Sequence, residues 1–398
     1  MKGGESVLVV DNGAWEFKWG WSGDAVPRST PNCLVKEKAG KVQAKKRVLV
    51  GEATREAREA GTVYRRPCER GCVVDWSLEK RLWDAAGLSA EAEGAALLVT
   101  VPPRLPARLG ADLAEVCFEE VGAGSLAAMA ATTAAGWSAG GGRGCSLVVE
   151  AGYSQAHVQL VLEGRSGPVG RLDAGGKALT NYLKEMVSYR QWNMMDETWL
   201  VNRVKERLAL VPERLEDELA ALARGDERAR ARSYVLPDYV ASRTGWVREE
   251  DPAPEPPPPP GTEQVLRMGP ERLALGEALF RPSDLGLPQM GLGEGALALL
   301  RAAPPAHAAA CAARVVLAGG TAQMPGFGER LLAELRAGLP DDVPVRLAAT
   351  QWPAPAQAPW RGATAFARSL DYPHTRVARG DYDEYGADLC RRRSAPYL

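Results

Sequence analysis

Three glycine-containing turns carry the residues of this sequence that could do chemistry. Segments 7–13 and 146–152 each place an acidic residue and a glycine after an apolar run, and the run at 315–318 meets Gly319 and Gly320. Such runs predict buried strands that break into tight turns. After the third turn a Pro-Gly pair and a helical pattern follow, so backbone amides and a helix N-terminus could face an anion or a nucleoside. One double-glycine turn also forms for local reasons, whereas three in one chain favour a binding cleft.

The elements around these turns repeat along the chain. Segments 7–13 and 146–162 share one design, a strand, an acidic residue, a glycine turn and a return to apolar residues. Between them lie helical spacing at 78–87 and 108–122 and a buried strand at 96–103 that two prolines end. This order, which recurs after about 140 residues, predicts a duplicated α/β domain with a cleft between the copies.

The second half of the chain is mainly helical in pattern. Helical spacing covers 177–191 and 196–211, and the charged run 212–233 has the spacing of an amphipathic helix, read as solvated or as a binding surface. Residues 252–260 hold seven prolines in nine positions. They predict an extended polyproline loop, which is either inert or a ligand for an aromatic groove.

Composition limits the class of protein. A chain of 398 residues suggests two or three lobes, of which two is the simpler reading, and 45% hydrophobic with 25% charged residues is typical of globular proteins. The net charge of -1 argues against a surface that is wholly devoted to nucleic acid. We expect no membrane span and no export signal, and the seven scattered cysteines suit a reducing compartment.

The three turns, in this order, are similar to the two phosphate loops and the adenosine loop of the actin, Hsp70 and sugar-kinase fold. Strings at 11–32, 70–84, 204–208 and 318–330 resemble the actin family. Within that family the chain resembles the actin-related protein 6 group through longer strings, at 31–33, 188–206, 234–239 and 279–291. The resemblance covers the chain nearly end to end.

This resemblance implies an α/β fold of actin/Hsp70 type, with duplicated ribonuclease-H-like domains and four subdomains around a central nucleotide cleft. The implied boundaries are 1–31, 66–140 and 360–398 for subdomain 1; 32–65 for subdomain 2; 141–175 and 288–359 for subdomain 3; and 176–287, with the Pro-rich loop, for subdomain 4.

Residues that match the family's nucleotide contacts are carried over one by one. In the family the first turn cradles phosphate oxygens, a lysine neutralises them, and an aspartate holds the metal through water. The matching positions are Asp11, Asn12, Gly13, Lys18, Glu150, Gly152, Gly176, Lys205, Glu206, Gly319, Gly320, Thr321 and Met324. The cofactor they imply is ATP or ADP.

The phosphate end departs from the family pattern. Ala14 and Trp15 stand where actins carry a hydroxyl and a glycine, and an indole in the cleft would fill the space of the terminal phosphate. Glu150 is a methylene longer than the family's aspartate, while Tyr153 and Ser154 replace an acidic residue and a glycine. Because Mg²⁺ needs near-ideal octahedral geometry, we expect weak metal binding and predict no protein metal site.

Hydrolysis also lacks a matching residue. The family positions water with a glutamine at a place that falls near Ala131 here, and such a group contributes a factor of ~10² or more. His157 matches a water-ordering histidine, but it also reads as a core histidine with satisfied hydrogen bonds. The sequence therefore predicts a pseudo-ATPase. At the nucleoside end Ala356 replaces a lysine of actin. The matched residues there have two interpretations, retained nucleotide binding or turns that are kept only for the fold.

The function that the resemblance implies is that of a non-catalytic subunit of a SWR/SRCAP-type chromatin remodeller in the nucleus, with the cytoplasm as a second location. Such a subunit would support nucleosome and histone binding and variant histone exchange. Its partners would be the remodeller ATPase, other subunits of that complex, histones and heterochromatin protein 1. The alternative is a slow ATP-binding switch with residual ATPase activity. Filament assembly is a third class of function, but we expect no filament, because the 36–47 segment is basic where the loop of actin is uncharged.

A basic segment supplies a second candidate site. Within 36–47 there are six basic residues and one acidic residue, unlike the uncharged loop of actin at that place. They form either a DNA or histone contact, a nuclear import signal, or an exposed loop with solvated charge. The basic residues are Lys36, Lys38, Lys41, Lys45, Lys46 and Arg47, and Arg391 to Arg393 are weaker candidates of the same kind.

Overall fold

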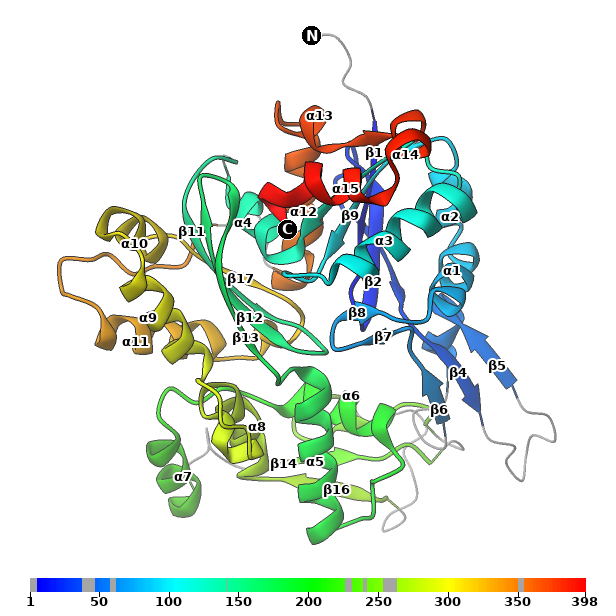
Figure 1. Cartoon of the computed structure of the whole chain (residues 1–398). Helices are drawn as coiled ribbons and strands as arrows, with labels where there is room; N and C mark the ends of the chain where they lie inside the picture. Colours follow the sequence, from blue (N-terminus) through cyan, green and yellow to red (C-terminus); the bar gives the residue numbers. More distant parts are fainter. Residues whose placement is uncertain are drawn as a thin grey trace.

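The computed structural model describes residues 6–37, 47–57, 62–140, 142–225, 231–238, 242–252, 263–349 and 354–398. Figure 1 shows two lobes side by side, each built on a mixed sheet with helices on its faces. We call the lobe around β1 the first lobe and the lobe around β11 the second lobe.

The first lobe is built on a six-stranded sheet in the order β18-β10-β9-β1-β2-β3. Its central strands are parallel and buried on both faces, which explains their unbroken apolar runs. The strands are β1 (Val7–Asp11), β2 (Glu16–Trp21), β3 (Arg28–Pro31), β9 (Ala96–Val101), β10 (Ser125–Ala130) and β18 (Val377–Ala378).

Helices cover both faces of this sheet. The Asp75 carboxylate caps the first of them by accepting from the Leu78 amide at 3.1 Å. These helices are α1 (Trp76–Ala85), α2 (Leu88–Ala92), α3 (Ala107–Glu115) with a wider turn at Val116–Glu120, α12 (Ala358–Ala367), α13 (Tyr372–Thr375), α14 (Arg379–Tyr385) and α15 (Ala387–Ser394), with a final 3-10 turn at Ala395–Tyr397.

Two small antiparallel units extend the first lobe toward the cleft. The first is the sheet β5-β4-β6, and the second is a two-stranded hairpin. Their strands are β4 (Leu34–Glu37), β5 (Arg47–Val50), β6 (Thr62–Arg65), β7 (Cys68–Glu69) and β8 (Cys72–Val73), with a 3-10 turn at Gly51–Glu56.

The second lobe repeats the design of the first. Its sheet has the order β13-β12-β11-β17, and β11 pairs antiparallel with β12 and parallel with β17 as β1 does with β2 and β9. The strands are β11 (Ser146–Ala151), β12 (Ala156–Leu162), β13 (Arg165–Leu172) and β17 (Val315–Ala318). The predicted duplication of an α/β domain is therefore confirmed.

The remaining elements of the second lobe pack around this sheet and below it in Figure 1. Its helices are α5 (Gly176–Arg190), α6 (Thr198–Leu208), α7 (Leu215–Arg224), α8 (Glu271–Phe280), α9 (Leu292–Ala302), α10 (Pro305–Ala312) and α11 (Phe327–Gly338), with 3-10 turns at Pro282–Leu285, Thr321–Gln323 and Pro355–Gln357. A small sheet β15-β14-β16 is formed by β14 (Arg232–Val235), β15 (Trp246–Val247) and β16 (Val265–Met268).

Two helices join the lobes. Helix α4 (Ala131–Ser138) packs against α12, and small residues of both lobes form one cluster around them. A Cβ atom built on Gly362 of α12 would lie 1.6 Å from the Ala134 carbonyl oxygen of α4, so only glycine allows this approach. The lobes are thus joined by the close backbone contact between α4 and α12.

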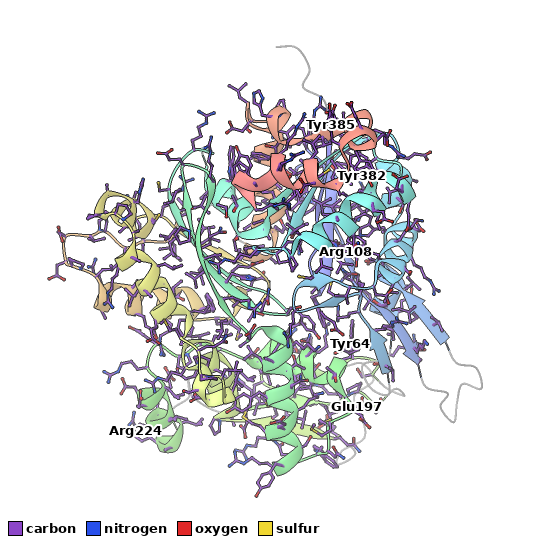
Figure 2. The ribbon with its side chains drawn as sticks, in the orientation of Figure 1. Tyr64, Arg108, Glu197, Arg224, Tyr382 and Tyr385 are labelled. Carbon is purple, nitrogen blue, oxygen red and sulfur yellow. The ribbon has the colours of Figure 1, made fainter. Side chains whose placement is uncertain are left out.

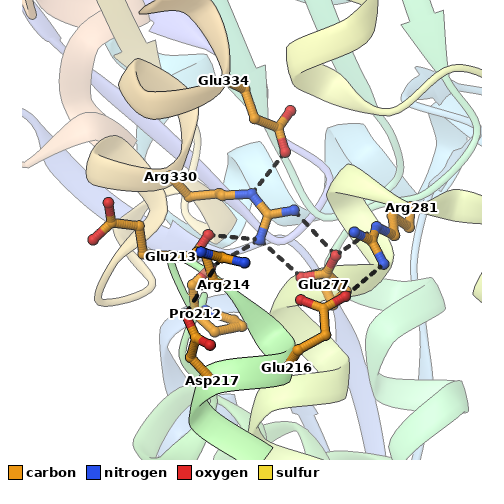
Figure 3. Close-up of polar contacts among 9 residues, drawn as sticks. All are labelled: Pro212, Glu213, Arg214, Glu216, Asp217, Glu277, Arg281, Arg330 and Glu334. Carbon is orange, nitrogen blue, oxygen red and sulfur yellow. Dashed lines mark hydrogen bonds and ion pairs between the residues drawn. The ribbon is translucent and has the colours of Figure 1, made fainter. Parts of the chain in front are cut away.

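A buried ion pair fixes α11, which follows the third glycine turn, against α8 (Figure 3). The Arg330 guanidinium donates to the two carboxylate oxygens of Glu277 at 3.0 and 3.1 Å, and Glu277 is completely buried. It also donates to the Pro212 carbonyl at 3.0 Å and to the Glu334 carboxylate at 2.6 Å. Such a paired, fully hydrogen-bonded charge fixes geometry, and its loss would leave a buried carboxylate alone.

One predicted element is wrong in its extent. The helix expected over 212–233 ends at Arg224, because Gly225 adopts a left-handed conformation with φ of 78°, and the chain is already in strand β14 at Arg232. Pro252 is exposed and residues 253–260 lie outside the described residues. Within the described ranges no helix is long and apolar enough to cross a membrane. The subdomain boundaries remain a prediction.

Candidate functional site

A cavity of about 660 Å³ lies where the three glycine turns meet. Its walls include all the residues that the sequence offered as nucleotide contacts, from Asp11 in the first lobe to Met324 in the second. This volume is within the range of small-molecule sites in proteins. The fold therefore brings the candidates together, while their contact with a nucleotide remains a prediction.

The first turn holds an acidic residue and a lysine opposite each other. The pairing of β1 with β2 sets Asp11 against Lys18, and the Lys18 ammonium lies 3.7 Å from the Asp11 carboxylate. The Thr100 hydroxyl donates to the same carboxylate at 2.7 Å. Burial raises the pKa of Asp11, against the opposing effects of Lys18 and Thr100. Both charges that the family directs at a metal and a phosphate are engaged with each other here.

A carboxyl that the sequence did not single out lies beneath this turn. Glu79 of α1 is completely buried and accepts from the Trp83 indole at 3.0 Å and from the Asn32 amide. The Asn32 amide also donates to the Gly13 carbonyl at 3.1 Å, which links the carboxyl to the turn above it. Burial raises the pKa of Glu79 to about 7. The helical periodicity of the sequence did not distinguish Glu79 from an ordinary exposed glutamate.

The second turn carries a chain of three polar side chains. His157 Nδ1 lies 3.0 Å from the Glu150 carboxylate, and His157 Nε2 lies 3.1 Å from the Gln155 amide nitrogen. These neighbours fit a neutral ring whose Nδ1–H donates to Glu150 and whose Nε2 accepts from Gln155. Both ring nitrogens therefore have protein partners, which supports the structural reading of His157. Gln155 itself was not anticipated from the sequence.

Two aromatic rings stand between the first and second turns. The ring of Trp15 lies 4.8 Å from that of Tyr153, centroid to centroid, and both residues line the cavity. The sequence left the direction of the Trp15 side chain open, and the structure places it in the wall of the cleft. The two rings thus stand in the wall of the cavity at the end to which the resemblance assigns the phosphates.

Lys205, at the other end of the cavity, has no hydrogen left for a ligand. Its ammonium donates to the Gly176 carbonyl at 2.9 Å, to the Thr180 hydroxyl at 3.0 Å and to the Asn202 amide oxygen at 2.8 Å. The side chain is buried, and burial lowers its pKa to about 8. Lys205 thus ties α6 to the start of α5.

The third turn is held against the second by close backbone contact. Gly319 has a φ of 87°, and a Cβ atom there would lie 2.2 Å from the Ala151 carbonyl oxygen. The Thr321 hydroxyl donates to the Gly152 carbonyl at 2.8 Å. Gly320 and Met324 line the cavity beside them. This end retains room for a nucleoside, bounded by Glu206, which also accepts from the Asn202 amide at 2.8 Å.

The residues present do not fit a magnesium-bound polyphosphate. Trp15 and Tyr153 meet between the first and second turns, and Asp11 is paired with Lys18. Ala131 and Ala356, where the family carries a glutamine and a lysine, both line the cavity. The nucleoside end fits better than the phosphate end.

The basic segment is seen only at its ends. Lys36 is exposed on β4 and Arg47 begins β5, whereas Lys38, Lys41, Lys45 and Lys46 lie outside the described residues. Near the C-terminus, Arg391 and Arg392 both pair with Asp388, and Arg393 pairs with Asp381. Neither region's contact with DNA or histones is tested by these observations.

Comparison with known proteins identifies the family. The actin family model matches residues 3–395. Actin-like protein ARP6 of Yarrowia lipolytica is 32% identical over 395 residues, which cover 97% of each chain. Actin-related protein 6 of Drosophila melanogaster is 32% identical over 400 residues, 96% of this chain and 98% of the relative, and ARP6 of Cryptococcus neoformans is 35% identical over 97% of this chain and 84% of its own. Sheets, turns and relatives agree, and the chain belongs to the actin family, within its actin-related protein 6 group.

Proposed function

We propose that this chain is a non-catalytic actin-related subunit of a SWR/SRCAP-type chromatin-remodelling complex, in which it supports nucleosome and histone binding and variant histone exchange. The observation that carries the proposal is the contact between Trp15 and Tyr153 across the phosphate end of the cleft. A chain that keeps the actin fold over nearly its whole length but sets two aromatic rings at its phosphate end fits a role that uses the shape of the fold rather than its reaction.

The chemistry of the cleft supports the non-catalytic part. An attacking water would have no glutamine to orient it, because Ala131 forms that part of the cavity wall. His157 is hydrogen-bonded to Glu150 and Gln155. Loss of a positioning group costs a factor of ~10² or more. The two aromatic rings at the phosphate end and the pairing of Asp11 with Lys18 add to this support.

The proposed partners are the remodeller ATPase, other subunits of that complex, histones and heterochromatin protein 1, in the nucleus. The support for this assignment is the similarity to actin-related protein 6 relatives from yeast and fly. The test is immunoprecipitation of the tagged full chain from nuclei with mass spectrometry. Remodeller subunits should co-purify with it, and a precipitate that lacks them contradicts the proposal.

Catalysis is tested separately, on the purified chain. Phosphate release from Mg-ATP should equal that of buffer, both for the natural chain and for Lys18→Ala. Release above buffer that Lys18→Ala abolishes would favour the alternative, a slow ATP-binding switch. That alternative has in its favour the cavity of about 660 Å³ and the presence of Asp11 and Lys18 in it.

A DNA contact through the 36–47 segment is a further part of the proposal. Each lysine that contacts a phosphate contributes about one unit to the slope of log affinity against log salt. Replacing Lys36, Lys45 and Lys46 together by alanine should therefore flatten the slope for nucleosome binding by about three units. An unchanged slope would assign the segment a different role, such as nuclear import.

A further inference from the structure

Five side chains meet at the mouth of the cleft in what we call the aromatic clasp. They are Trp15, Tyr64, Arg66, Tyr153 and Trp199. Trp15 is central, since its ring lies 4.8 Å from that of Tyr153 and stacks on that of Trp199 at 5.4 Å. Tyr64 meets the edge of Trp199 at 6.0 Å, and burial together with the Tyr153 hydroxyl raises its pKa. Ring pairs at these separations attract beyond simple area burial.

The clasp joins the two lobes. Trp15 follows β1, Tyr64 lies on β6 and Arg66 follows it, all in the first lobe. Tyr153 follows β11 and Trp199 is at the start of α6, both in the second lobe. Figure 2 labels Tyr64 where the small sheet of the first lobe approaches the lower helices. Both ring–ring contacts that Trp15 makes within the clasp therefore cross the cleft.

Arg66 anchors the rings to the first turn. Its Nη1 donates to the carbonyl oxygens of Ala14 and Trp15, both at 3.0 Å, and to that of Asn32 at 3.2 Å. The guanidinium carbon lies 4.1 Å from the centroid of Trp15 and 4.8 Å from that of Tyr153. A cation held against two ring faces from opposite lobes attracts both.

A second contact crosses the cleft beside the clasp. The tip of the β7/β8 hairpin in the first lobe places Gly71 so close to Gln155 of the second turn that a Cβ atom there would lie 3.0 Å from the Gln155 amide nitrogen. Gln155 is in turn held by His157. The backbone of the β7/β8 hairpin thus lies against the Gln155 side chain of the other lobe.

We propose that the aromatic clasp holds the two lobes closed without a bridging polyphosphate or metal. In the family the first and second turns approach the phosphates from opposite sides; here the same two turns contact each other directly through Trp15 and Tyr153. The clasp follows from the failure of the phosphate end to fit a magnesium-bound polyphosphate. It concerns the free chain, and it holds whatever assembly the chain joins.

The test is hydrogen–deuterium exchange of the full chain, with and without Mg-ATP. In the natural chain, amides of 62–65 and 198–202 should exchange equally fast in EDTA and in Mg-ATP. The double substitution Trp15→Ala with Tyr153→Ala should speed their exchange about tenfold or more, since each aromatic pair contributes up to about a factor of ten. Amides of β9 should stay as slow as in the natural chain, which shows that the fold is intact.

Matched variants keep the test decisive. Trp192→Ala, which removes an exposed tryptophan of the second lobe outside the cleft, should leave exchange at 62–65 unchanged. If the double variant does not fold, Trp199→Leu keeps an apolar side chain but removes the stack, and should produce a smaller increase at the same amides. Unchanged exchange in a folded clasp variant, or slowing of these amides by Mg-ATP in the natural chain, overturns the proposal. The nuclear precipitation experiment is unaffected by either result.

Discussion

The two ends of the cleft differ in how their residues relate to the family's pattern. At the phosphate end the residue types themselves have changed, so that Trp15 and Tyr153 meet where small and acidic residues are expected. At the nucleoside end Lys205 and Thr321 match the family, yet their hydrogen bonds go to Gly176, Thr180, Asn202 and Gly152 of the protein itself.

The difference teaches that a retained residue is not necessarily a retained ligand contact. A lysine ammonium has three hydrogens, and all three of Lys205 have protein acceptors. At this end a family match can persist because it joins α5, α6 and the turns into one unit. The following predictions test two points. The first is whether the matched residues of the nucleoside end serve to join elements of the fold, and the second is whether the phosphate end has become part of the core.

The largest effect is expected from Gly319→Ala at the third turn. A left-handed φ of 87° and a Cβ atom 2.2 Å from the Ala151 carbonyl oxygen should lower the free energy of unfolding by about 4 kcal/mol. Urea denaturation measures it. Gly320→Ala is the matched control, because the nearest atom to its Cβ is 3.9 Å away, and a similar loss there would contradict the assignment of strain to Gly319.

Glu79→Gln should change the pH dependence of stability. Its pKa is raised from 4.5 to about 7, so the folded state retains a proton that the unfolded state releases, and the natural chain should lose stability as pH rises between these values. The variant lacks this loss, which amounts to about 3 kcal/mol above pH 7. Urea titrations at pH 5 and pH 8 measure it. If the free energy of unfolding changed equally between pH 5 and pH 8 in both proteins, the Glu79 carboxylate would lie in an environment that stabilises its charge.

Lys205→Ala should act on stability rather than on a ligand. It leaves the Gly176 carbonyl and the Asn202 amide oxygen to share the single hydrogen of the Thr180 hydroxyl, so one buried acceptor loses its donor, which should cost about 2 kcal/mol in the absence of any nucleotide. Lys177→Ala on the exposed side of α5 is the control and should change little. If Lys205→Ala preserved stability and abolished ATP binding instead, the nucleoside end would be a ligand site.

The smallest effect is expected from Thr100→Val under the first turn. The substitution keeps the shape but removes the donor at 2.7 Å from the Asp11 carboxylate, so stability at neutral pH should fall by about 1 kcal/mol. The loss should shrink at low pH, where Asp11 is protonated. Thermal unfolding at two pH values measures it, and a pH-independent loss would indicate a packing defect alone.

Much of the fold was readable from the chain. Apolar runs at 7–13, 96–103 and 146–162 predicted strands that the structure contains, because strands buried on both faces need unbroken apolar sequence. The predicted helix over 212–233 was too long, because charged residues continue past Gly225. Hydrophobic periodicity does not show that Gly225 ends the helix in a left-handed conformation. The altered residues of the phosphate end could also be identified from the sequence, because a change of residue type at a turn that matches the family is read directly from the chain.

What the sequence determined by itself was the family, the duplicated α/β design and the change of residue type at Trp15 and Tyr153. Only the tertiary structure decided that Arg66 and Trp199 join these rings across the cleft, that Glu79 is buried beneath the first turn, and that Lys205 is saturated by protein acceptors. The reason is physical. Residue type is a property of the chain, but burial and hydrogen-bond partners depend on segments that only folding brings together.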